Sequence, residues 1–176
     1  MAHISLPEGL PGIIGPLEAY PETGIPLSHF TEALLRGPSS LTSAERELIA
    51  THVSNRNECR FCTQSHAAAA RHLWEDGSVV DEVLEGGEAA SLSEKMKALL
   101  QIAGKVQTGG RGVTDEEVRR ARAAGADDRA IHDTVLVAAA FCMFNRYVDG
   151  LATLEPDPSA YPAMGERLAK AGYARG

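Results

Sequence analysis

Aromatic side chains, cysteine and basic charge are all scarce in this chain of 176 residues. Phe, Trp and Tyr together make up 5% of the sequence, and three residues are cysteine. Three cysteines are too few for a disulfide framework. The formal net charge is −7 and the basic residues are scattered, which argues against nucleic acids and anionic membranes as partners.

Long apolar segments are also missing. No apolar run approaches the ~20 residues that a membrane-spanning helix requires, and residues 1–5 have neither the basic nor the apolar region of a secretory signal. We therefore expect a cytoplasmic protein. Hydrophobic residues make up 44% and charged residues 23% of the chain, which is typical of a globular domain.

The pattern of the remaining sequence predicts an all-α fold. Alanine runs at 67–70 and 138–140 allow helices to approach closely, and no segment alternates with the period of a strand. Thr42 with Glu45, and Thr114 with Glu117, form capping boxes that begin helices. The predicted helices cover residues 31–35, 42–54, 59–74, 78–85, 93–106, 115–124, 127–150 and 164–171.

Proline divides the chain into three parts. Five of the nine prolines lie within residues 1–28, so we expect an extended N-terminal arm there, broken by a short helix near residues 17–20. Residues 29–155 form the predicted single helical domain. Residues 156–176 form a C-terminal tail with a short helix.

The chemistry of the chain centres on Cys59, Cys62 and His66. On a helix, these spacings of three and four residues place all three side chains on one stripe. Two thiols and an imidazole on one face are suited to dithiol chemistry or to binding a soft metal. In a reducing cytosol, a Cys-x-x-Cys is more often redox-active or metal-binding than a permanent disulfide.

Several neighbouring features favour the reactive thiolate. We expect Asn57 to cap the helix and Cys59 to lie in its first turn, where the helix dipole stabilises negative charge. His66 can accept a proton from Cys62. Glu47 lies on the preceding helix, and an antiparallel hairpin would bring its carboxylate to His66 and fix the tautomer of the ring. These residues form a predicted Glu-His-Cys relay.

Other interpretations use the same residues. Cys59, Cys62 and His66 could bind Zn²⁺ with Glu47 or water as the fourth ligand. The dithiol could serve a general disulfide reductase, or it could be idle in a non-catalytic helical oligomer. Cys142 lies in an apolar run and is expected to be an inert buried cysteine.

The motif residues resemble a known superfamily. Glu47, eleven further residues and then Cys59-x-x-Cys62-x-x-x-His66 are similar to the motif of the alkylhydroperoxidase D and carboxymuconolactone decarboxylase superfamily. The best-known members have a histidine immediately before the second cysteine, where this chain has Phe61. The run from 144 to 151, with its Asn-Arg and Asp-Gly pairs, resembles the peroxidase-related branch. The resemblance covers about residues 30–155.

This resemblance implies an alkylhydroperoxidase D-like helical bundle that assembles into dimers, trimers or hexamers. It also implies a peroxidase cycle in which Cys62 reacts with a hydroperoxide to form a sulfenic acid and Cys59 converts it to a disulfide. His66, oriented by Glu47, would move the proton. The reductant would be an external dithiol, either a thioredoxin-like protein or a lipoyl group. No haem, flavin or nicotinamide motif is present, so no cofactor is expected.

Overall fold

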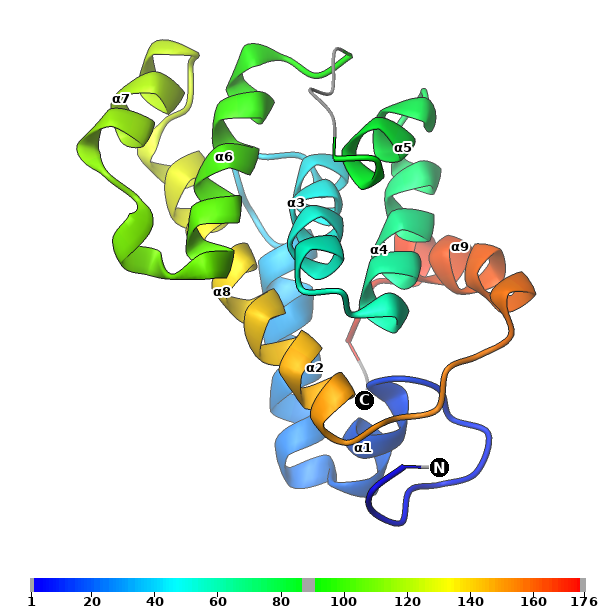
Figure 1. The fold of residues 1–176 in the computed structure, drawn as a ribbon. Coiled ribbons are helices and arrows are strands. Elements are labelled where there is room, and N and C mark those ends of the chain that lie inside the picture. The colour runs from blue at the N-terminus through cyan, green and yellow to red at the C-terminus, as the bar shows by residue number, and fades with distance from the viewer. Residues whose placement is uncertain (1, 87–90, 175–176) are drawn as a thin grey trace.

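The computed structural model describes residues 2–86 and 91–174, and in these residues it contains helices and no strand. The all-α prediction is confirmed. Figure 1 shows α3 surrounded by α4, α6 and α8, with α9 lying against α4. The helices are α1 (Ile14–Ala19), α2 (Pro21–Arg36), α3 (Ser43–Arg56), α4 (Arg60–Leu73), α5 (Ser78–Leu84), α6 (Glu94–Thr108), α7 (Asp115–Ala123), α8 (Asp128–Gly150) and α9 (Tyr161–Ala171), with short 3-10 turns at Gly110–Gly112 and Pro158–Ala160.

Both predicted capping boxes are present. In α3, Glu45 N donates to Thr42 Oγ1 over 3.1 Å, and Thr42 N donates to Glu45 Oε2 over 2.8 Å. Thr114 caps α7 in the same reciprocal way. Each box satisfies backbone donors that a helix end otherwise leaves unpaired. The N-terminal ends of α3 and α7 are therefore determined by the local sequence alone.

The core lies where α3, α6 and α8 meet. Leu48, Ile49 and Val53 of α3 are fully buried, and Val137 of α8 is too. Burying such side chains contributes roughly 1.5–3 kcal/mol each. Because α3 lies at the centre of this core, its polar residue Glu47 is removed from water as well. Among the helices of the described residues, none is both long enough and apolar enough to cross a membrane.

The N-terminal segment differs from the extended arm that we expected over residues 1–28. It is helical from Ile14, in α1, and α2 runs from Pro21 to Arg36 although a second proline, Pro26, lies inside it. Pro21 occupies the first turn, where a missing N–H costs nothing. Pro26 lies near the same end of the helix and removes one backbone hydrogen bond. Treating each proline as a helix breaker was therefore wrong here.

The turn before α4 also differs from the prediction. Asn57 ends α3, Glu58 adopts a left-handed φ of 59°, and Cys59 is the N-cap of α4. Cys59 therefore precedes the helix instead of occupying its first turn. Cys62 and His66 lie within α4, as the pattern predicts.

Helices α4 and α9 approach closely at Gly165. A Cβ added to Gly165 would lie 2.4 Å from the carbonyl carbon of Ala68. The predicted helix at 164–171 begins earlier, at Tyr161, so that Gly165 falls in its first half. This contact fixes the place of α9 and of the chain that follows it.

We predict that Gly165→Ala destabilises the protein by about 1–3 kcal/mol, because the added methyl group must push the two backbones apart. Urea unfolding followed by circular dichroism measures the change. Gly150→Ala is the matched control, since a Cβ at Gly150 meets nothing within 4 Å. Equal stability of the two variants would show that α9 is free to shift away from α4.

Candidate active site

The hairpin of α3 and α4 brings Glu47 and His66 into direct contact. His66 Nδ1 lies 2.7 Å from Glu47 Oε2, and the Glu47 side chain is fully buried. An ionised carboxylate can only accept hydrogen bonds, so Nδ1 carries a proton, and in the neutral ring Nε2 is then the nitrogen without one. This is the tautomer that leaves one ring nitrogen free to act as a base.

Two residues that sequence reasoning did not find complete the surroundings of Glu47. Its other oxygen, Oε1, accepts hydrogen bonds from Arg36 Nη2 and from the Tyr173 hydroxyl, each over 2.5 Å. The Tyr173 ring also stacks on His66, with centroids 5.8 Å apart and planes 12° apart. Arg36 lies 11 residues before Glu47 and Tyr173 lies 126 residues after it. No local spacing could have revealed either contact.

The chain after α9 holds Tyr173 in place. The backbone N–H of Tyr173 donates to Glu32 Oε2 over 2.6 Å. Gly172, with φ +69°, makes the turn that allows this, and a Cβ there would lie 2.3 Å from the same Glu32 oxygen. Because both the positive φ and the space favour glycine, the position of Tyr173 is set by its own backbone.

These contacts determine the charge state of the cluster. Burial alone would raise the pKa of Glu47, but the proximity of His66 and Arg36 and the hydrogen bond from Tyr173 hold that pKa below its usual value. Burial, and then the negative charge of Glu47, raise the pKa of Tyr173 well above its usual value. At neutral pH, Glu47 is therefore ionised and Tyr173 remains a hydrogen-bond donor.

The two thiols lie together but in different environments. Cys59 is 0% and Cys62 is 3% exposed, and both are free. The pKa of Cys59 is raised above its usual value. The largest cause is a hydrogen bond to Cys62, followed by burial, the charge of Cys62 and a hydrogen bond to Asp149. The expected stabilisation of a thiolate at Cys59 is thus wrong, because the contact with Cys62, three residues away, and burial outweigh the helix dipole. The contact with Cys62 thus favours the protonated form of Cys59.

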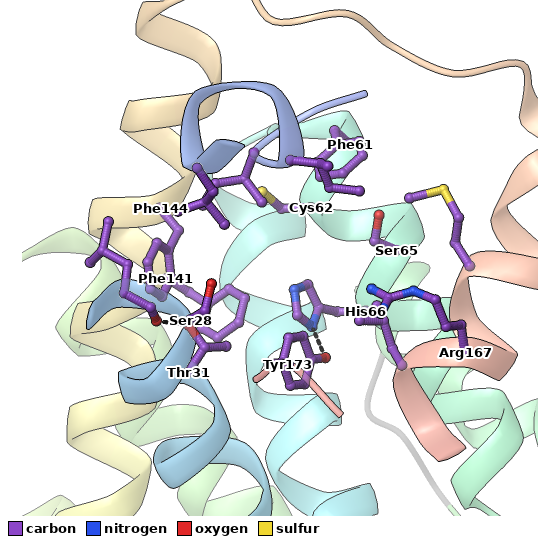
Figure 2. Close-up of a pocket in the computed structure, with 16 residues that line it drawn as sticks. Ser28, Thr31, Phe61, Cys62, Ser65, His66, Phe141, Phe144, Arg167 and Tyr173 are labelled. Carbon is purple, nitrogen blue, oxygen red and sulfur yellow. Dashed lines mark hydrogen bonds between the residues drawn. The ribbon is translucent and has the colours of Figure 1, made fainter. Parts of the chain in front are cut away.

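A mainly apolar pocket of about 100 Å³ is lined by one of the two thiols and by the imidazole. Cys62 and His66 of α4 both line it, and the rest of its wall comes from side chains of α1, α2, α8 and α9 and from Tyr173, as Figure 2 shows. Phe141 meets the His66 ring edge-on, with centroids 4.5 Å apart. Cys59 does not line the pocket. Only one of the two thiols is therefore presented to a small molecule.

The Asn-Arg pair of the C-terminal motif has a structural position. Asn145 is buried; its side chain accepts a hydrogen bond from Asn57 over 2.8 Å and donates one to Ser54 over 3.0 Å. These bonds tie α8 to the turn that leads to Cys59. Arg146 donates to the carbonyl of Cys142, and Cys142 itself is half-buried instead of fully buried as expected.

The zinc interpretation does not fit this geometry. Within residues 2–86 and 91–174, no three His, Cys, Asp or Glu side chains are arranged to hold one metal ion. His66 Nδ1 is already bonded to Glu47. The arrangement instead offers a thiol in an apolar pocket, a second thiol behind it and an oriented imidazole beside it.

We predict that Glu47→Gln lowers the free energy of unfolding by about 3 kcal/mol at pH 7, because it leaves Arg36 buried without its partner. The pKa of Glu47 is lowered in the folded state, so the stability it contributes is complete well above pH ~4.3 and is lost as pH falls below that value. The difference between wild type and variant should therefore narrow in acid.

Urea unfolding between pH 7 and pH 3 measures this difference. Glu75→Gln is the control, because Glu75 is exposed. The free energy of unfolding of this variant should equal that of the wild type at every pH. A difference between wild type and Glu47→Gln that stays constant down to pH 3 would mean that Glu47 is not ionised in the folded protein.

A comparison with family models matches residues 21–105 to the carboxymuconolactone decarboxylase family. The matched segment contains Glu47, both cysteines of the pair and His66. A search of curated proteins finds no match.

Solved structures extend the similarity beyond this segment. An uncharacterized peroxidase-related protein from Silicibacter sp. TM1040 is 28% identical, with a TM-score of 0.76 over 84% of this chain and 78% of that one. An uncharacterized peroxidase-related protein with an alkylhydroperoxidase AhpD core, from Ralstonia eutropha JMP134, is 25% identical, with a TM-score of 0.79 over 88% of this chain and 80% of that one.

A third structure, of a protein of unknown function from Agrobacterium tumefaciens, shares the fold at 21% identity, with a TM-score of 0.70 over 83% of this chain and 99% of that one. The fold is thus alkylhydroperoxidase D-like, as the motif suggested. Residues 21–105, a little under half of the chain, therefore resemble the carboxymuconolactone decarboxylase family, within a fold that is alkylhydroperoxidase D-like over most of the chain.

Proposed function

We propose that this protein reduces hydroperoxides through a thiol–disulfide cycle of Cys62 and Cys59. The observation that carries the proposal is the shared pocket: Cys62 and His66 line one apolar cavity, with Cys59 hydrogen-bonded behind Cys62. The names of the two peroxidase-related structures support the same reaction class.

The first step is attack by the Cys62 thiolate on the terminal peroxide oxygen. The sulfur–oxygen bond forms as the oxygen–oxygen bond breaks, which gives a sulfenic acid on Cys62 and an alkoxide that leaves as the alcohol after taking a proton. The Cys59 sulfur then attacks the Cys62 sulfur and releases water. In sum, one hydroperoxide and two thiols give one alcohol, one water and the Cys59–Cys62 disulfide.

His66 moves the protons in this scheme. Its Nδ1–H is held by Glu47, so Nε2 can take the proton of the Cys62 thiol and return it to the leaving alkoxide. Glu47, Arg36 and Tyr173 do not touch the peroxide in this proposal. They position the imidazole and maintain its tautomer.

The disulfide must be reduced by an external dithiol, which we propose to be a thioredoxin-like protein or a lipoyl group. Cys62 is the sulfur that lines the pocket, so it is the one that an incoming thiolate would attack. Two electrons and two protons from the external dithiol then restore both thiols and leave the reductant as a disulfide.

The roles of the two cysteines predict that their variants fail differently. Cys59→Ser should consume one equivalent of hydroperoxide and hold a sulfenic acid on Cys62, because the nucleophile remains and its resolving partner is gone. Cys62→Ser should consume none. Single-turnover peroxide consumption, together with dimedone trapping and mass spectrometry, measures both. A sulfenic acid found on Cys59 of the Cys62→Ser protein would reverse the assignment.

The relay predicts that His66→Ala slows single-turnover consumption on the order of 10²–10⁴-fold, the usual contribution of general acid–base assistance. His29→Ala is the control, because His29 is exposed on α2 and does not line the pocket. Unchanged kinetics in His66→Ala would discard the relay, while normal kinetics in the His29 variant are expected in either case.

We also propose that the protein is a homo-oligomer, as the family resemblance implies. One face of α8 supports this, because Leu136 and Met143 are 36% and 45% exposed and stand seven residues apart, with Ala139 between them. Residues at that spacing share one side of a helix. Such a face is suited to packing against the same helix of a second copy.

Light scattering at micromolar concentration should therefore give a mass of at least twice 18.7 kDa. Met143→Glu should lower that mass, since a buried carboxylate at the contact lacks a partner. Glu75→Gln should leave it unchanged. A wild-type mass of one chain would contradict the proposal.

A further inference from the structure

The pocket contains two buried hydroxyl groups that have no hydrogen-bond partner within the part of the chain that the structure describes. Ser28 and Ser65 line the pocket and are 3% and 2% exposed, yet neither Oγ has a hydrogen-bond partner among the described residues. A buried polar group without a partner is costly, and such groups are rare in folded proteins. Two of them on one cavity indicate that a polar ligand completes their bonding.

A free positive charge lies on the same pocket. Arg167 lines it from α9, and Figure 2 shows the guanidinium reaching from that helix toward His66. No salt bridge of Arg167 is found in the part of the chain that the structure describes. Of the carboxylates nearby, Glu47 is held by Arg36, and Glu32 accepts the backbone N–H of Tyr173. Arg167 is exposed, and it offers the pocket a cation that none of the ion pairs among the described residues occupies.

We infer that the substrate is a compact hydroperoxide with an apolar body and a carboxylate at its far end. This inference rests on the proposed function and names the substrate class for the same site. The peroxide oxygens would meet Cys62 and the two serine hydroxyls, and the carboxylate would pair with Arg167. Arginine suits this task because its planar guanidinium matches a carboxylate with two parallel hydrogen bonds.

The size of the pocket limits the apolar body. A cavity of 150 Å³ holds benzene, so about 100 Å³ accommodates roughly four carbon-sized groups. The side chains of Leu17, Phe141 and Phe144 provide the apolar wall. The two peroxide oxygens occupy part of this space, so a chain of two methylene groups between the peroxide and the carboxylate satisfies the limit, with the carboxylate outside the apolar part.

The test uses 3-hydroxypropanoate, the alcohol that reduction of 3-hydroperoxypropanoate would yield, and its neutral analogue propane-1,3-diol. Titration calorimetry on the reduced protein should give a Kd for the carboxylate about tenfold lower than for the diol, the range of a hydrogen-bonded charge. Arg167→Gln should remove this preference. Lys170→Gln, which removes a cation from the same helix away from the pocket, should retain it.

The serines are tested by Ser65→Ala, which should weaken both ligands to the same degree without lowering the melting temperature. Equal affinity of the wild type for acid and diol, loss of the preference in Lys170→Gln, or no binding of either ligand would each overturn the inference. Because binding needs no turnover, the proposed function is judged separately: selective binding without peroxide consumption would reject the peroxidase and keep the anion-selecting site.

Discussion

The fully buried carboxylate of Glu47 is the group on which the rest of the site depends. Its two oxygens accept hydrogen bonds from His66 of α4, Arg36 of α2 and Tyr173 in the chain after α9. Removing one partner would leave the other charge, Glu47 or Arg36, buried without a counter-charge, which is strongly unfavourable. The positions of α2, α4 and the chain after α9 relative to α3 thus depend on this one side chain.

This coupling joins stability to chemistry. Glu47 orients the imidazole of His66, and its own charge is balanced in the core by Arg36. The contacts that stabilise the fold are therefore also the contacts that hold the imidazole in place. The thiol pair follows a different logic. It lies in a smaller apolar cluster with Phe61, Tyr161 and Val148. The hydrogen bond to Cys62 and burial raise the pKa of Cys59, and Cys62 is the thiol that lines the pocket.

The parts of this arrangement that could be predicted are local ones. Capping boxes locate helix starts within one or two residues, and the motif spacing, together with a short turn, places Glu47 opposite His66. Tyr173 could not be predicted, because its partners lie more than 100 residues away. The thiolate argument for Cys59 failed for a different reason, since the contact with Cys62, only three residues away, together with burial outweighs the position at a helix terminus.

Tyr173 also gives the site an order of assembly. It follows His66 by 107 residues, and at roughly 5–20 residues per second a ribosome needs about 5–20 s to add them. During that interval the nascent chain carries its two thiols and its imidazole, while the ring that stacks on the imidazole has not been made. The oriented base is therefore completed only after most of the chain has left the ribosome, and partly synthesised chains carry an unfinished centre.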